Sequence, residues 1–226
     1  MKKLLSIWIF FSLLSCGDND LEEKVLSVPD FEYPELVMVS GYTADLMEPF
    51  LSRDGAVLFF INLNSPNVYT NLYWATRNSD ISFQYQGELG NVNTSTLEGV
   101  PTMDFGNNLY FVSTRSYDQS LSTIYSSKYS AGILSEIVLV TGVSRNEVGW
   151  VNFDVEIAAD GNTMYLVDGR FDENGGPYES NFVLATRENG VFARSTQSTT
   201  IFQNINTGDL EYAAAITQNQ LEMCFT

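Results

Sequence analysis

Apolar and polar positions follow one another in short runs along most of this chain, and turn-forming residues separate the runs. In the clearest example, residues 48–60, two apolar stretches flank the pair Asp54-Gly55. An Asp-Gly pair tolerates the positive φ that a tight hairpin turn requires. Aromatic and β-branched residues are dense in these runs, which predicts strands. Beyond the first residues no stretch keeps a long helical period, so we expect almost no helix.

The same phrase returns three more times in weaker form. Its second apolar stretch is centred on Leu58, Leu109, Met164 and Leu221, at spacings of 51, 55 and 57 residues. A regular recurrence at about 40 to 50 residues or slightly more, in strand-forming sequence, indicates the blades of a β-propeller.

Each repeat also carries two further strand-like runs. The third run ends on small residues and a cation, and a turn and a fourth run follow it. These runs lie at residues 71–77 and 78–83, 122–128 and 130–134, and 181–187 and 188–192. Four antiparallel strands per repeat make one propeller blade. The sequence therefore predicts an all-β propeller over residues 36–226, with blades at about 45–95, 96–148 and 149–208 and a partial blade at 209–226.

A two-sheet β-sandwich is the alternative fold. Sandwich strands also alternate apolar and polar positions, with a turn about every 8 to 12 residues. Three elements that recur in the same order across three repeats favour the propeller, which gives about 3.5 blades.

The fourth repeat reaches Thr226 after two of its strands. Propeller rings need closure to protect their strand edges. Our preferred explanation is a truncated product or a fragment of a longer reading frame. An open arc that closes by oligomerisation, or a four-bladed ring completed by an early strand at residues 35–39, are the other two.

The residues of the best copy permit a comparison with a known repeat. Residues 48–60 read Glu-Pro-x-x-Ser-x-Asp-Gly-x-x-Leu-Phe-Phe, and residues 72–77 and 189–192 read Leu-Tyr-Trp-Ala-Thr-Arg and Asn-Gly-Val-Phe. This pattern resembles the TolB-type, WD-like β-propeller repeat, which is common in lipoproteins and periplasmic proteins of Gram-negative bacteria. The similarity extends from about residue 45 to the end of the chain. The resemblance implies a binding or scaffold module of the cell envelope more than any one activity.

The first sixteen residues carry a targeting signal. Lys2 and Lys3 precede an apolar core at residues 4–14, and Leu-Leu-Ser then leads into Cys16 as in a bacterial lipobox. The apolar core is too short to span a bilayer as a helix. We expect a signal peptide at residues 1–15 that is removed, and acyl chains including diacylglycerol on Cys16 that anchor the protein in the bilayer. An uncleaved anchor or an ordinary signal peptide is the alternative.

The segment after the lipobox is polar and acidic. Residues 16–35 contain few core-forming side chains, and Pro29 and Pro34 follow the acidic run. We expect a flexible tether that holds the propeller at the cell envelope, on the periplasmic or surface face of the outer membrane. The acidic residues next to Cys16 are similar to the export cue of some Bacteroidetes-type lipoproteins, or they are a solvated spacer.

Charge and the missing residue types exclude several functions. The formal net charge is −17, and removal of Lys2 and Lys3 takes it to −19 (−17 − 2). Nucleic acids and anionic membrane surfaces need a cationic footprint, so neither is an expected partner. The chain has no histidine, which excludes Ser-His-Asp and Cys-His catalysis and His-ligated zinc. With Cys16 acylated, Cys224 has no disulfide partner, and we expect it to be a small core residue.

Three carboxylates are the candidate site residues. They stand ten positions before the central apolar residue of a repeat, and they are Glu48, Asp154 and Glu211. The second repeat breaks the pattern with Gly99, although Glu98 is one residue early. The first strand of each blade lines the channel of a propeller, so these carboxylates could gather at one mouth and bind Ca²⁺ or a basic ligand. Alternatively, they cap strand ends or bond the backbone between blades. A further acidic stretch, residues 168–176, reads as a solvated surface excursion.

Two functions remain open from the sequence. The first is a lipid-anchored envelope module, without catalytic residues or a required cofactor, that binds a protein, a peptide or a glycan. The second is a carboxylate-dependent glycan-active hydrolase, or a metal-dependent lactonase-like one. A glycan-active enzyme would need two neighbouring carboxylates in a pocket, one of them with a raised pKa.

Overall fold

The structure is a computed structural model that describes residues 33–62 and 69–226. The chain divides into Met1–Glu35 and Leu36–Thr226, and every assigned strand belongs to the second unit. The predicted signal peptide at residues 1–15, the lipobox Cys16 and nearly all of the predicted tether at 16–35 lie outside the described residues.

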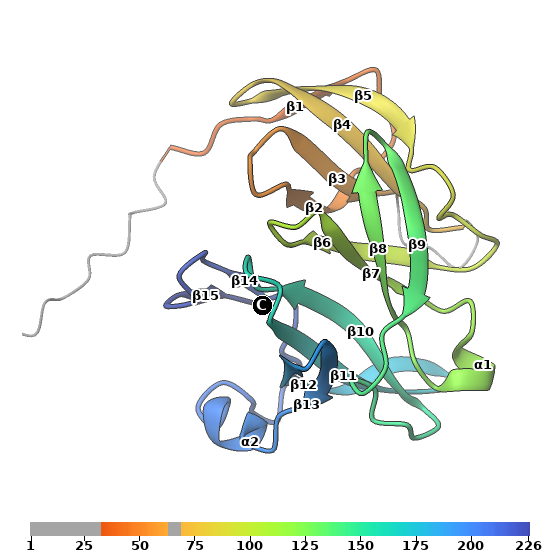
Figure 1. Cartoon of the computed structure of the whole chain (residues 1–226), viewed down its shortest axis with the longest axis vertical. Coiled ribbons are helices and arrows are strands. Elements are labelled where there is room, and N and C mark those ends of the chain that lie inside the picture. Colours follow the sequence, from red (N-terminus) through yellow and green to blue (C-terminus); the bar gives the residue numbers. More distant parts are fainter. Residues whose placement is uncertain (1–32, 63–68) are drawn as a thin grey trace, which may run out of the picture. The chain divides into compact units, whose positions relative to one another are not determined.

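The first sheet has five strands, and Figure 1 labels each of them. They are β1 (Met38–Ser40), β2 (Met47–Leu51), β3 (Val57–Ile61), β4 (Leu72–Ser79) and β5 (Ser82–Glu88). Strands β2 to β5 pair with their sequence neighbours in antiparallel fashion, and β1 adds to β5 in parallel. The early strand therefore extends the first sheet. It does not complete the partial fourth repeat, so the explanation by a four-bladed ring closed in this way is wrong.

Two more four-stranded sheets and a hairpin follow. The second sheet contains β6 (Glu98–Met103), β7 (Asn108–Ser113), β8 (Ile124–Ser130) and β9 (Ile133–Leu139). The third contains β10 (Trp150–Ile157), β11 (Thr163–Asp172), β12 (Gly175–Glu188) and β13 (Val191–Arg194). Strands β14 (Ala215–Ile216) and β15 (Met223–Cys224) form the hairpin. In the second and third sheets each strand pairs with the next one along the chain.

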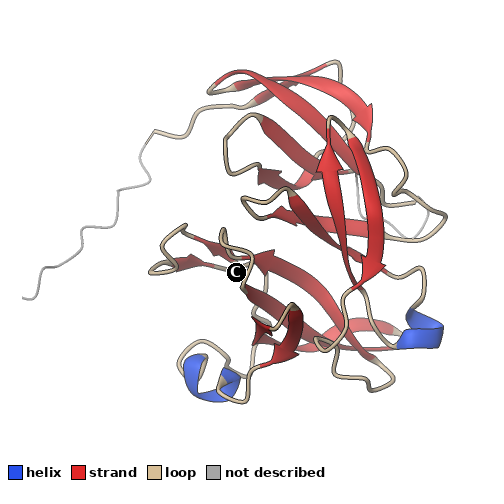
Figure 2. Ribbon diagram, in the orientation of Figure 1, coloured by secondary structure: helices blue, strands red, loops and turns tan. Residues whose placement is uncertain are grey.

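Helix is almost absent from the described residues, as predicted (Figure 2). The two helices, α1 (Tyr117–Ser120) and α2 (Ser198–Ile201), have four residues each. No helix in the described part of the chain has the length and apolar character needed to cross a bilayer.

Consecutive four-stranded antiparallel sheets are the blades of a β-propeller. The described residues form three such blades, the first with β1 added at its edge, and the first half of a fourth, which confirms the predicted all-β fold of about 3.5 blades. The sheets pack through apolar faces. One buried cluster joins the first and second blades and includes Phe59, Leu72, Leu109 and Phe111. A second joins the second and third blades and includes Tyr110, Ile124, Met164 and Leu166.

Strand β7 explains why the apolar runs do not alternate strictly. Leu109 and Phe111 belong to the first cluster, whereas Tyr110 and Val112 belong to the second. Successive side chains of a strand point to opposite faces. Because both faces of the middle blade are covered, a continuous apolar run satisfies both neighbours.

The half blade shows the consequence of having one covered face. Met223 packs against a cluster of the third blade that contains Val167 and Phe182. Cys224, its neighbour in β15, points the other way and is exposed. The prediction that Cys224 is a core residue was therefore wrong.

Packing between blades predicts a large effect of truncating Phe111. Its ring is fully buried and stacks on Tyr125 at a centroid distance of 5.7 Å. We expect Phe111→Ala to lower the free energy of unfolding by about 3–5 kcal/mol, measured by urea denaturation. The matched control is Phe105→Ala, at a side chain that is 55% exposed, where we expect a loss below about 1 kcal/mol. Equal losses in the two variants would contradict the packing described here.

Candidate functional site

Two of the predicted carboxylates lie at bulges in the first strands of their blades. The register of β2 against β3 shifts between Met47 and Phe50, and that of β10 against β11 shifts between Asn152 and Asp154. Glu48 sits in the first bulge with φ 48°, and Asp154 ends the second. Bulges bend a strand and re-aim the side chains within it.

Glu48 is half-buried and bonds to the second blade. Its Oε2 atom accepts a hydrogen bond of 2.8 Å from the backbone N–H of Val100 on β6. Burial raises the pKa of the Glu48 carboxyl, and the hydrogen bond from Val100 opposes that rise.

Asp154 is buried and bonds to the half blade. Its Oδ2 atom accepts a hydrogen bond from the backbone N–H of Ala213. The pKa of Asp154 is raised to about 7. Burial is the largest cause, the hydrogen bond from Ala213 opposes the rise, and the negative charge of Glu48 adds to it. The negative charge of Glu48 therefore acts on Asp154, while each of the two carboxyl groups bonds to the backbone of a different blade.

The four first strands can be aligned by a hydrogen bond that each one makes at its turn. The backbone N–H of Ser52, Asp104, Ala158 and Thr217 bonds to a carbonyl at the start of the next strand. Four residues before these positions stand Glu48, Val100, Asp154 and Ala213. Glu48 in the first blade and Asp154 in the third carry a carboxylate at this position. Each accepts a hydrogen bond from the N–H of the equivalent residue in the next blade, which is Val100 or Ala213.

Glu211 is not part of this set, which corrects the sequence alignment. The turn of the fourth repeat closes between Thr217 and Glu222, so Met223 rather than Leu221 is the counterpart of Leu58. The residue ten positions before Met223 is Ala213, and Glu211 stands two residues earlier. Its true counterpart is Glu98, which stands two residues before Val100.

A repeated phrase explains why Glu98 and Glu211 resemble one another. Residues 93–98 and 206–211 both read Asn-Thr-x-x-Leu-Glu. The Asn93 side chain bonds both the N–H and the carbonyl of Leu72, and the Asn206 side chain does the same to Phe182. Sequence reasoning missed this phrase, although its spacing was visible.

The threonine of the phrase binds the glutamate four residues later. Thr94 donates to Glu98 from its N–H and its hydroxyl, and Thr207 does so to Glu211. The phrase therefore fastens the start of a blade to the preceding one. Glu211 has this fastening role and, in the described residues, forms no hydrogen bond with Glu48 or Asp154.

Asp168 corrects another expectation, because it does not belong to a solvated excursion. Its side chain is buried and forms an ion pair with Arg194, with N–O distances of 2.9 and 2.5 Å. Asn152 also donates to it, at 2.7 Å. The exposed part of the acidic stretch is the tip of the hairpin that joins β11 to β12.

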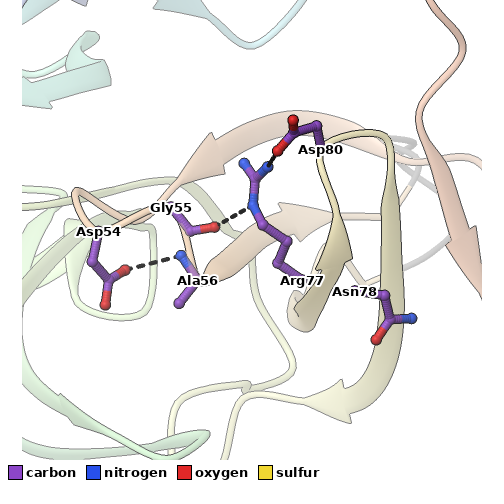
Figure 3. A pocket seen from close by; sticks show the side chains of 6 residues that line it. All are labelled: Asp54, Gly55, Ala56, Arg77, Asn78 and Asp80. Atoms are coloured by element: carbon purple, nitrogen blue, oxygen red, sulfur yellow. Dashed lines mark hydrogen bonds and ion pairs between the residues drawn. The ribbon is translucent and has the colours of Figure 1, made fainter.

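A shallow polar hollow on the first blade is separate from the carboxylate pair (Figure 3). It measures about 590 Å³, and its lining residues are Asp54, Gly55, Ala56, Arg77, Asn78 and Asp80. The Arg77 guanidinium bonds the carbonyl of Gly55 and the carboxylate of Asp80. Because its arginine is already paired and its surface is open, this hollow offers little to a ligand.

No group of three or more acidic or thiol side chains in the described residues is placed to hold a metal ion. The predicted Ca²⁺ site therefore has no assembled ligand set in this part of the chain, and calcium binding stays a prediction.

Comparison with known proteins supports the fold. No protein-family model and no curated protein matches the sequence. A glycoside hydrolase superposes with a TM-score of 0.50 at 9% identity, over 80% of this chain and 65% of that one. A gluconolactonase of Xanthomonas campestris superposes with a TM-score of 0.48 at 12% identity, over 85% of this chain and 57% of that one. A thermostable family-43 glycoside hydrolase superposes with a TM-score of 0.46 at 12% identity, over 80% of this chain and 64% of that one. The chain thus spans about three fifths of these proteins, and at such identities the likeness shows a β-propeller fold alone.

The raised pKa of Asp154 predicts how stability depends on pH. Between its ordinary value of 3.8 and about 7, the folded protein holds a proton that the unfolded chain has lost. Stability therefore falls as the pH rises through this window, by up to about 4 kcal/mol from this group. We expect the free energy of unfolding of Asp154→Asn, taken relative to the unmodified protein in urea denaturation, to increase between pH 4 and pH 8. Asp118→Asn, at an exposed position, is the control, and a difference that does not change with pH would contradict the assignment.

Proposed function

We propose that this propeller hydrolyses glycosidic bonds with Asp154 and Glu48. The observation that carries the proposal is the buried Asp154 carboxyl, whose pKa is raised to about 7 by burial and, to a smaller degree, by the negative charge of Glu48. Glycoside hydrolysis usually requires two carboxyl groups, one of them protonated near neutral pH.

The two groups differ in environment, which assigns their roles. Asp154 is buried and keeps its proton up to about pH 7, so it is the general acid that protonates the leaving-group oxygen. Glu48 is half-buried, and its negative charge is one cause of the raised pKa of Asp154, so we assign Glu48 the role of the ionised partner. It then serves as the base that accepts a proton from the attacking water, or as the nucleophile, according to the separation of the two groups.

The fold is compatible with this proposal, since a glycoside hydrolase shares it. That likeness supports the architecture and leaves the chemistry to the carboxyl pair. A panel of substrates identifies the sugar unit and the linkage that is cleaved.

A non-catalytic binding module for a protein, a peptide or a glycan is the second candidate. It is favoured by the hydrogen bonds that both carboxyl groups already accept from the backbone of the next blade. It is also favoured because neither Glu48 nor Asp154 lines the hollow on the first blade.

A panel of nitrophenyl glycosides and envelope polysaccharides separates the two candidates. We expect hydrolysis that Glu48→Gln and Asp154→Asn each lower at least about 100-fold, because each removes one of the two acid–base groups. The rate should also fall above about pH 7, where Asp154 loses its proton. Glu136→Gln, at an exposed residue of β9, is the control and should leave the rate unchanged. Binding to a glycan without turnover, unaffected by the two active-pair variants, would favour the binding module instead.

We also propose that the protein is anchored to the outer membrane through acylated Cys16, with the propeller held in the envelope. The basis is the lipobox at residues 13–16, which lies outside the described part of the structure. We expect Cys16→Ser to abolish incorporation of radiolabelled palmitate and to move the protein from the membrane to the soluble fraction. Cys224→Ser is the matched control, and labelling that persists in Cys16→Ser would refute the anchor.

A further inference from the structure

Arg53 links the first strands of three blades. It lies in the turn that follows β2, the strand of Glu48. Its Nε atom donates to the carbonyl of Met103 on β6 at 2.8 Å. Its Nη2 atom donates to Glu156 Oε1 at 2.9 Å and to the carbonyl of Ile157 at 2.6 Å, both on β10.

Glu156 is the side chain on β10 that receives this link. It stands two residues after Asp154, so both side chains lie on the same face of the strand. Its Oε1 atom accepts from Arg53, and its Oε2 atom accepts from the hydroxyl of Thr102 on β6 at 2.5 Å. Both oxygens of this buried carboxylate are therefore paired, and the partners come from the first and second blades.

The ion pair is well shielded from water. The side chain of Arg53 is 15% exposed and that of Glu156 is 7% exposed. Loss of one partner from a buried pair leaves an uncompensated charge, which costs far more than loss of an exposed pair. The guanidinium fork also fixes direction, because its donors are coplanar and rigid.

We infer that Arg53 is a positioning residue that holds the strand of Glu48 at a fixed distance from the strand of Asp154. The catalytic meaning of this inference rests on the proposed function, whereas the geometric link does not. The backbone of β2 leads directly from Glu48 into Arg53, and that of β10 leads from Asp154 into Glu156 and Ile157. One side chain therefore sets the separation of the two carboxyl groups across the intervening β6.

Amide hydrogen exchange in the intact protein tests the link without any substrate. The reporters are the N–H groups of Val100, bonded to Glu48, and of Ile157, bonded to the Thr102 hydroxyl. The references are Leu166 and Val183, which face each other within the third blade. We expect Arg53→Met to speed exchange at both reporters at least about tenfold more than at the references.

Arg145→Met is the matched control, because Arg145 forms an exposed pair with Glu147 and stacks on Trp150. It should leave the reporters unchanged. Arg53→Lys keeps the positive charge but lacks the planar guanidinium fork, and it replaces Arg53→Met in the experiment if that variant does not fold. It should speed exchange at the same two reporters to a smaller degree. Exchange that rises equally at reporters and references in both Arg53 variants, or not at all, would overturn the inference. If the unmodified protein shows no glycosidase activity but Arg53→Met still speeds exchange at the two reporters, the proposed function is refuted and the positioning role of Arg53 stands.

Discussion

The burial of one apolar sheet face against the next is the interaction on which this molecule depends. The second blade shows it most clearly, because Leu109 and Phe111 enter one interior and Tyr110 and Val112 enter the other. A face that carries several aromatic and branched side chains fits its neighbour in one register only. That register decides which residues of the first strands meet, and so it places the backbone of the next blade against the carboxyl groups of Glu48 and Asp154.

Within this framework the buried acids divide by the way their charge is balanced. Glu98, Glu156 and Asp168 pair with Arg115, Arg53 and Arg194. Asp154 has no cation among the described residues and receives backbone N–H groups instead, while the charges of Glu48 and Glu156 act against its ionisation. A buried carboxyl without a cation is stabilised by holding a proton. Asp154 is suited to proton transfer because burial, together with the nearby negative charges, raises its pKa to about 7.

The strands and the blades were predictable from the sequence, because apolar runs and turn residues act locally and recur. Register was harder, since it depends on bulges and on turn lengths that the apolar pattern does not record. The turn of the fourth repeat is the example: Leu221 has the right residue type, but the hydrogen bond of Thr217 makes Met223 the counterpart, so Glu211 was aligned with the wrong residues. The fastening role of the repeated Asn-Thr-x-x-Leu-Glu phrase could have been found by comparing residues 93–98 with 206–211. The role of Arg53 could not have been found in this way, because its partner Glu156 is 103 residues away and only the packed blades bring the two together.

A titration of the Asp154 side-chain carboxyl, followed by ¹³C nuclear magnetic resonance in the intact protein, shows whether this buried group holds its proton near neutral pH. We expect a midpoint near pH 7 that moves down when Glu48 is replaced by Gln, because its negative charge is then removed. A midpoint near the ordinary aspartate value of 3.8, or one that ignores the Glu48 replacement, would contradict this expectation.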